Sequence, residues 1–203
     1  MNQTLPNPRN GRADVPGEPS AACPVLTAAL DEAIGGRPCL ELTQALCQTL
    51  SGLIREQRLV LPAVVFQPCP NHYARRQIHH CPELGYSVIA MTWGPGQGTP
   101  IHDHSGLWCV EGVVAGSLEI SQYELIERDG ERYRFEPRGT LAAGEGSAGS
   151  LIPPHEYHAI RNISDRDICV SLHVYGGQME RCCVFQPLAD GWHLRQDKPL
   201  SLD

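Results

Sequence analysis

The sequence predicts a mainly β protein in which a small N-terminal helical layer packs on a compact β-barrel. Two segments within 24–57 carry apolar side chains at the spacing of an amphipathic helix. From about residue 59, short runs of Val, Ile, Leu and Tyr alternate with Gly and Pro turns, which is typical of a barrel or sandwich. The 203 residues fit one domain at roughly 100–200 residues per domain. We expect this domain to span 21–203, with its barrel over about 59–195.

The N-terminal part of the chain changes character twice. Residues 1–20 are rich in Pro and Asn and poor in apolar side chains, which predicts a disordered or loosely ordered tail. Helices are expected over 24–35 and 38–57, with a Gly-Gly-Arg-Pro break between them. We expect one broad apolar stripe on the second helix, formed by Leu40, Leu42, Leu46, Leu50, Leu53 and Ile54.

The barrel strands are expected where β-branched and aromatic residues form short runs between turn residues. Short strands at this spacing favour a sandwich or barrel over alternating βα units. These runs are 85–94, 107–116, 117–126, 149–154 and 167–177.

Charge and composition exclude several classes of protein. The chain has 23 acidic and 16 basic residues and a formal net charge of -7, which argues against nucleic acid or an anionic membrane surface as a partner. Lys198 is the single lysine and follows no Gly-rich loop, so a P-loop lysine is excluded. The sequence shows no secretory signal, and its nine cysteines contain no CxxC pair. We therefore expect a cytoplasmic protein with reduced thiols that mostly pack as small apolar side chains.

The most informative segment contains His102, Asp103 and His104. On a strand, residues i and i+2 point to the same face, so the two imidazoles can share one metal ion. Asp103 then points to the opposite face and is a poor ligand. Alone, this pattern also fits two surface histidines on an edge strand.

The wider pattern adds a Gly-rich approach to the first histidine and a Pro-Pro-His-Glu-Tyr-His segment that ends at His158 and is followed by Asn162. It resembles the two signature motifs of the cupin superfamily. The resemblance implies a double-stranded β-helix (jelly-roll) barrel holding one metal ion, with His102, His104 and His158 as ligands. His155, three residues before His158, stays an alternative third ligand.

The position at which most cupins carry a ligating Glu is Cys109 in this chain. Three neutral imidazoles would then hold the ion, which leaves room for two substrate donors and dioxygen and favours six-coordinate ferrous iron over tetrahedral zinc. With this departure, the chain resembles thiol dioxygenases of the cysteine dioxygenase type. The matching segments are Tyr73-Ala74-Arg75, Trp93-Gly94, Ile101 to His104, Cys109, His158 with Arg161 to Ser164, and Ser171 to Tyr175.

The resemblance implies one Fe(II) per chain, L-cysteine and O2 as substrates, and cysteine sulfinate as product. It implies a thioether between Cys109 and Tyr175, which we expect to face each other across the barrel lumen. Ser171 and His173 would orient the Tyr175 hydroxyl, although the same row also fits a plain hydrogen-bonded polar row. Arg75, expected just before the first barrel strand, would bind the substrate carboxylate.

Several alternatives stay open at this stage. Arg76 could replace Arg75 as the carboxylate clamp, and Glu111 could be a fourth ligand or a carboxylate beside the metal. The substrate could be 3-mercaptopropionate or another small thiol carboxylate, although dioxygenases for that thiol tend to carry Gln at the position of Arg75. The chain could also be a non-catalytic metal-binding cupin that senses a thiol. We expect a monomer or weak homo-oligomer.

Overall fold

The computed structural model describes residues 23–35 and 38–203, so the predicted tail lies outside the described residues. Two helices and a short 3-10 turn precede the strands: α1 (Pro24–Ile34), α2 (Cys39–Arg55) and η1 (Ala63–Phe66). The strands are β1 (Ala74–Cys81), β2 (Tyr86–Trp93), β3 (Ile101–His102), β4 (Cys109–Ala115), β5 (Ser117–Asp129), β6 (Arg132–Gly144), β7 (Ala148–Leu151), β8 (His158–Asn162), β9 (Cys169–Tyr175), β10 (Arg181–Pro187) and β11 (His193–Pro199).

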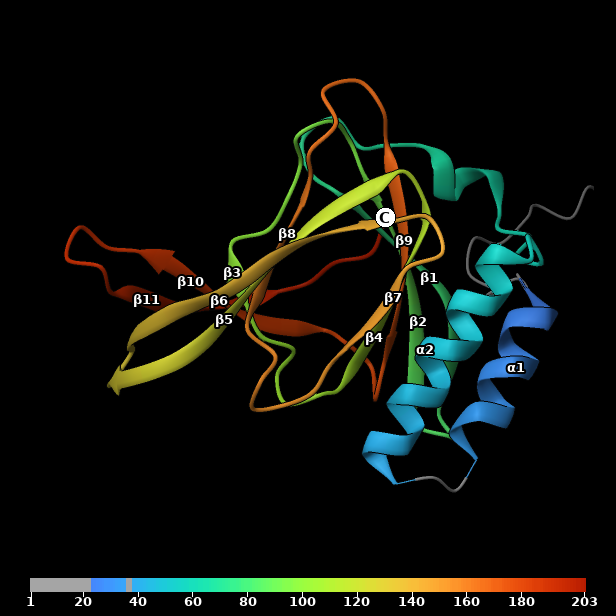
Figure 1. Cartoon of the computed structure of the whole chain (residues 1–203), viewed down its shortest axis with the longest axis horizontal. Helices are drawn as coiled ribbons and strands as arrows, with labels where there is room; N and C mark the ends of the chain where they lie inside the picture. Colours follow the sequence, from blue (N-terminus) through green and yellow to red (C-terminus); the bar gives the residue numbers. More distant parts are fainter. Residues whose placement is uncertain (1–22, 36–37) are drawn as a thin grey trace, which may run out of the picture.

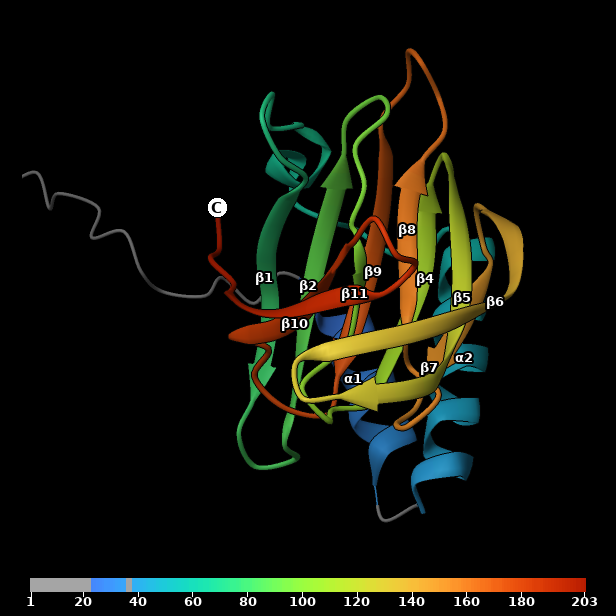
Figure 2. The same ribbon diagram turned by 90° about the vertical axis from the view of Figure 1, so that its left-hand side faces the viewer.

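The strands form two facing layers. One sheet has the order β1-β2-β9-β4-β7, and the other closes as β10-β11-β6-β5-β8-β3. Because β9 lies between β2 and β4, the chain crosses repeatedly between the layers, as a jelly-roll does. Figure 1 shows α1 and α2 covering the outer face of the first sheet, and Figure 2 shows β10 and β11 running across its strands. The protein is thus mainly β with the cupin double-stranded β-helix fold, as predicted.

The first sheet is buried on both faces, and alternation along β9 shows how. Val170, Leu172 and Val174 pack with α1 and α2, whereas Cys169 and Tyr175 belong to the core between the two sheets. Successive side chains on a strand point to opposite faces, so one strand serves both cores. The inner face is therefore the face available for a site.

The buried residues of α2 match the predicted apolar stripe except at its first position. Leu42, Leu46 and Leu50 are buried, but Leu40 is 63% exposed. Each residue on a helix is rotated by about 100° from the one before it, so positions i and i+2 lie about 200° apart. Leu40 therefore cannot share a face with Leu42. None of the described helices is long and apolar enough to cross a membrane.

The predicted apolar runs correspond to β2, β4, β5, β7 and β9. The first strand was misplaced, because β1 begins at Ala74 and includes both Arg75 and Arg76. Its Arg-Arg-Gln sequence hides the alternation on which the prediction relied. The charged strands β6 and β11 were missed for the same reason.

Candidate metal centre

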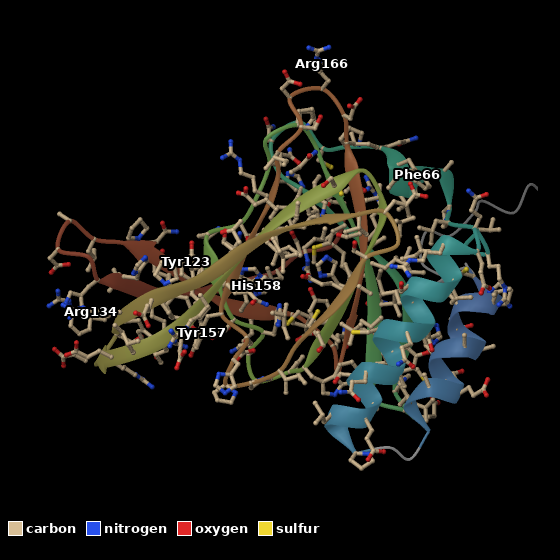
Figure 3. The ribbon with its side chains drawn as sticks, in the orientation of Figure 1. Phe66, Tyr123, Arg134, Tyr157, His158 and Arg166 are labelled. Atoms are coloured by element: carbon tan, nitrogen blue, oxygen red, sulfur yellow. The ribbon has the colours of Figure 1, made fainter. Side chains whose placement is uncertain are left out.

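The three predicted histidine ligands come together between the two layers. His102 on β3 lies directly opposite His158 on β8, and His104 follows two residues after His102, just beyond the strand. One ring nitrogen from each histidine lies within 4.8 Å of the others. His104 and His158 are buried. Figure 3 shows His158 among the side chains enclosed between the layers.

The protons of these rings are positioned to leave lone pairs for a metal ion. His102 Nδ1 lies 3.2 Å from the Pro100 carbonyl oxygen, and His158 Nδ1 lies 2.7 Å from that of Glu156. Because a carbonyl only accepts, each Nδ1 donates and each Nε2 keeps its lone pair. His158 Nε2 is buried without a hydrogen-bond partner, whereas His104 Nδ1 lies 4.0 Å from Glu156 Oε2. Buried polar atoms normally have partners, so the unpartnered His158 Nε2 fits a ligand to a metal ion.

Burial also keeps the three imidazoles neutral. It lowers the pKa of His102 to about 4 and holds the pKa of His104 and His158 well below the ordinary value. A metal ion binds the neutral form of imidazole. The site is therefore ready to bind a divalent ion at neutral pH.

Two carboxylates hold the histidine turn from outside the ligand group. Asp103 accepts hydrogen bonds from the backbone N–H of Cys183, at 2.8 Å, and of Ser105, at 3.1 Å. Buried Glu156 accepts from the backbone N–H of His104 at 3.1 Å, and burial raises its pKa to about 7. Asp103 thus fixes the turn through backbone hydrogen bonds. Glu156 supports the same turn through the His104 backbone, and no sequence motif indicated it.

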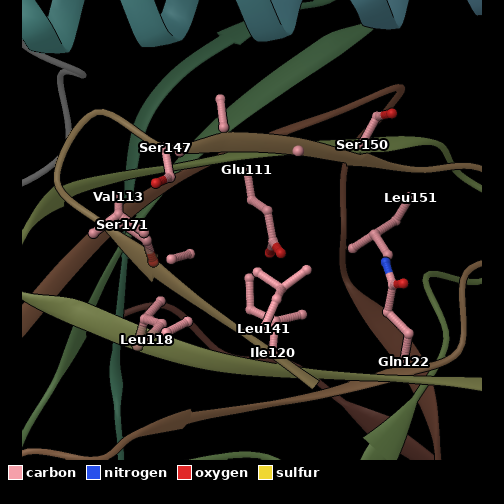
Figure 4. Close-up of a pocket in the computed structure, with 15 residues that line it drawn as sticks. Glu111, Val113, Leu118, Ile120, Gln122, Leu141, Ser147, Ser150, Leu151 and Ser171 are labelled. Carbon is pink, nitrogen blue, oxygen red and sulfur yellow. The ribbon is translucent and has the colours of Figure 1, made fainter. Parts of the chain in front are cut away.

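The two alternative ligands lie outside this group. His155 is exposed. Glu111 on β4 is buried and points into a cavity of about 150 Å³ between β4, β5, β6 and β7 (Figure 4). Its Oε2 lies 3.4 Å from Nδ1 of His173, and burial raises its pKa to about 7. Among the described residues, the group of three histidines includes neither side chain.

The polar row on β9 faces the same interior. Trp93 Nε1 donates to Ser171 Oγ at 2.9 Å, and Ser171 Oγ lies 2.9 Å from His173 Nε2. The rings of His173 and Tyr175 stack with centroids 6.0 Å apart, and Tyr175 lies edge-on to His104 at 5.6 Å. The row therefore runs from Trp93 to the histidine group.

Cys109 and Tyr175 are adjacent, but not across the lumen as expected. Cys109 on β4 is the direct antiparallel partner of Tyr175 on the neighbouring strand β9. Directly opposite residues on paired strands have Cβ atoms about 4.5–5.5 Å apart and share a face. Both side chains are buried. Paired strands of one sheet, rather than two facing sheets, thus bring them together.

Arg75 and Arg76 point to opposite faces of β1. Arg75 pairs with Met91 of the inner core, whereas Arg76 pairs with Ala90 of the helix-facing core. Arg76 donates outside the barrel, to Thr92 Oγ1 at 3.1 Å and to the carbonyl oxygen of Gln67 at 2.9 Å. The register therefore places Arg75 inward.

The Arg75 guanidinium is buried and only partly engaged. Nη1 donates to the Ser201 carbonyl oxygen at 3.1 Å and Nη2 to that of Met179 at 3.2 Å, while Nε has no partner. Burial, and then the charge of Arg75, lowers the pKa of His173 to about 3. The positive charge thus lies near the β9 row, and Nε is free for a ligand.

A second cavity, of about 230 Å³, opens beside Arg75. Tyr73, which stacks on Trp93 at 4.5 Å, and Lys198 line it. The C-terminal segment 199–203 forms one of its walls. Sequence reasoning missed this segment, because its contacts with Arg75 join residues more than a hundred positions apart and no local pattern contains them.

Residues 66–187 match the family model described as cysteine dioxygenase type I. A protein named cysteine dioxygenase type 1 from Danio rerio is 26% identical over 100 residues, which cover 49% of each chain. The protein of the same name from Homo sapiens is 24% identical over the same shares. The chain therefore spans about half the length of the curated relatives it matches.

Solved structures also align with part of the chain. A Klebsiella pneumoniae protein with a double-stranded β-helix domain aligns with TM-score 0.45 and 16% identity, over 60% of this chain and 85% of that one. An RmlC-like cupin from Desulfovibrio desulfuricans aligns with TM-score 0.41 and 19% identity, over 59% and 94%.

Proposed function

The chain belongs to the cysteine dioxygenase type I family, and from this premise we propose that it is a non-haem iron thiol dioxygenase that converts L-cysteine to cysteine sulfinate. The observation that carries the proposal is the group of three neutral histidines, two of them buried, without a carboxylate. Within the same interior lie an inward arginine and a tyrosine.

One Fe(II) per chain suits the donor set. Three neutral imidazoles leave the full charge of a divalent ion in place, which favours binding of an anionic thiolate. When bound, the iron would supply the position at which thiolate and dioxygen meet and would keep the thiol deprotonated. His102, His104 and His158 would hold it, and Glu156 would hold the His104 backbone.

Arg75 is the residue we propose for the substrate carboxylate. A planar guanidinium can take both carboxylate oxygens, and burial excludes water that would weaken the contact. Arg76 is not suited to this role, because its guanidinium is bound on the other face of β1. Cysteine would then direct its thiol and amine toward the histidines and its carboxylate toward β1.

The row on β9 would orient the substrate side of the site. Since Trp93 can only donate, Ser171 Oγ accepts its N–H and can direct its own hydroxyl proton to His173 Nε2. His173 then keeps a proton on Nδ1, and its ring position fixes that of Tyr175 by stacking. We propose that Tyr175 touches the bound substrate and carries the thioether to Cys109, whose side chain lies beside it.

The proposal includes a cytoplasmic location and a monomer or weak homo-oligomer. The net charge of -7 supports the absence of nucleic acid or an anionic membrane as partner.

Oxygen consumption with a panel of thiols, combined with metal analysis, tests the proposal. We expect about one iron per chain, coupled oxygen uptake with L-cysteine, and loss of both in His104→Ala. His155→Ala is the matched control, because its side chain is exposed and outside the ligand group. Oxygen uptake with 3-mercaptopropionate but not with L-cysteine would identify 3-mercaptopropionate as the substrate. Full iron content with no uptake from any thiol would contradict the enzyme and favour a sensor.

A further inference from the structure

A second cluster of metal-binding side chains lies outside the three-histidine group. Cys69 and His72 belong to the loop before β1, and Asp203 comes from the C-terminal segment beside it. His72 Nε2 lies 2.8 Å and Cys69 Sγ lies 3.8 Å from the same oxygen, Oδ1 of Asp203. We propose that these three side chains bind a divalent transition-metal ion of the zinc type, at a site separate from the iron.

The donor set matches the chemistry of zinc. Zn²⁺ is bound by Cys thiolate, His nitrogen and Asp oxygen, at about 2.3 Å for sulfur and about 2.0 Å for nitrogen and oxygen. Tetrahedral geometry then places neighbouring donors roughly 3.3–3.5 Å apart. The observed separations of 2.8 and 3.8 Å lie on either side of this range. Small side-chain rotations would therefore complete the site, with a fourth position open to water.

The backbone around the cluster is already fixed. Gln97 Nε2 donates to the carbonyl oxygen of Cys69 at 2.8 Å. Asp203 exchanges bonds with Arg75: its backbone N–H donates to the Arg75 carbonyl oxygen, and its Oδ2 accepts the Arg75 N–H, each at 2.8 Å. Oδ2 is thus held by β1 while Oδ1 faces Cys69 and His72. An ion would bind to a partly preorganised site, which reduces the entropy lost on binding.

The ion would tie the C-terminal segment to the loop before β1. Figure 2 shows the C-terminus beside β1, and the segment lines the 230 Å³ cavity together with His72 and Arg75. The carbonyl oxygen of Ser201 in this segment accepts from Arg75 Nη1. Metal binding would therefore hold the wall of the cavity in which the guanidinium lies.

A second surface cluster, formed by Asp31, His79 and Cys81, provides a comparison. Its Asp31 Oδ1 accepts the Tyr86 hydroxyl at 2.7 Å, a partner that is not a metal ligand, whereas the side chains on Asp203 Oδ1 are the two other proposed ligands. We therefore expect Cys69, His72 and Asp203 to bind the ion more tightly. Cys81→Ser and Cys69→Ser each remove one thiol from one cluster, so the pair of variants separates the two sites.

The experiment adds Zn²⁺ to the full chain with iron already bound and measures Zn²⁺ affinity by competition with a chromophoric chelator. We expect one site that weakens at least tenfold in Cys69→Ser and in Asp203→Asn and is unchanged in Cys81→Ser. Hydrogen exchange at the Asp203 amide should slow on Zn²⁺ addition in the wild type and not in Cys69→Ser. Affinity unaffected by Cys69→Ser, or lost in Cys81→Ser, would overturn the proposal. Neither readout uses thiol oxidation, so the result stands apart from the iron chemistry.

Discussion

Replacing Arg75 by glutamine removes the positive charge that faces the β9 row and keeps a polar side chain of similar reach. In the wild type, the guanidinium gives one N–H each to the carbonyls of Ser201 and Met179 and keeps further N–H groups, including buried Nε, for a ligand. A substrate carboxylate would take two of these. The variant therefore loses a charge-assisted bidentate contact in a site from which water is largely excluded.

The size of the loss follows from these contacts. Each hydrogen bond between charged groups is worth about 1.5–3 kcal/mol, so a bidentate pair contributes at least about 3 kcal/mol. Glutamine can regain one hydrogen bond to the charged carboxylate, worth about 1.5 kcal/mol. The net loss of about 1.5 kcal/mol corresponds to roughly a tenfold decrease in kcat/KM for L-cysteine, at about 1.4 kcal/mol per factor of ten.

The assay is initial-rate oxygen uptake by iron-loaded protein, with L-cysteine and 3-mercaptopropionate compared in parallel. Mercaptopropionate lacks the amine and would bind differently, so we expect a smaller decrease for it. Arg76→Gln is the matched control, since it removes the same charge from the opposite face of β1. A decrease in kcat/KM caused by Arg76→Gln but not by Arg75→Gln would refute the assignment. No decrease in either variant would remove the main argument for cysteine as the substrate. Unfolding curves show whether loss of the Ser201 and Met179 contacts contributes.

Three further changes test other parts of the structure. Cys109→Ser should retain partial activity, but mass spectrometry after turnover should no longer detect the species lighter by two hydrogens that a thioether to Tyr175 produces; its persistence would exclude this pair. Gly98→Ala should destabilise the fold by about 1–3 kcal/mol, as overpacking does, because its Cβ would lie 2.5 Å from a backbone carbonyl oxygen. Gly144→Ala, with nothing within 4 Å of its Cβ, is the control, and equal urea midpoints would contradict the packing. Burial raises the pKa of Glu111 from 4.5 to about 7, so its contribution to the stability of the metal-free fold is present below about pH 4.5 and lost as the pH rises through about 7. This fall in the free energy of unfolding is on the order of 3 kcal/mol. Glu111→Gln should reduce it, as measured by urea unfolding at several pH values across that range. An unchanged pH profile would contradict the buried carboxyl.

The sequence predicted the barrel and the shared face of His102 and His104 because both depend on local patterns, whereas His158 was predicted from the family resemblance. Two imidazoles two residues apart and alternating apolar runs carry their geometry in their spacing. The predicted apolar stripe on the second helix was wrong only at Leu40, which was included because it is apolar although it does not lie on the buried face. Alternation likewise predicted that Ser171, His173 and Tyr175 share a face, and the inner core contains the side of β9 to which Tyr175 belongs.

The features that were missed depend on pairings between segments distant in the sequence. The neighbours of Cys109 follow from the order of β9 and β4 in the sheet, which no single-strand pattern contains. Charged residues in β1 conceal its period, so Arg75 was expected just before the strand and not in it. The contacts of Arg75 with Met179 and Ser201 join residues over a hundred positions apart.

Isotope labelling of the product tests the proposed dioxygenase chemistry most directly. Iron-loaded protein is incubated with L-cysteine under ¹⁸O2, and the sulfinate is analysed by mass spectrometry. If the three-histidine centre brings thiolate and dioxygen together as proposed, both sulfinate oxygens carry the label, and no sulfinate forms with His104→Ala. Product containing one oxygen from water, or no sulfinate from fully iron-loaded wild-type protein, would contradict the account.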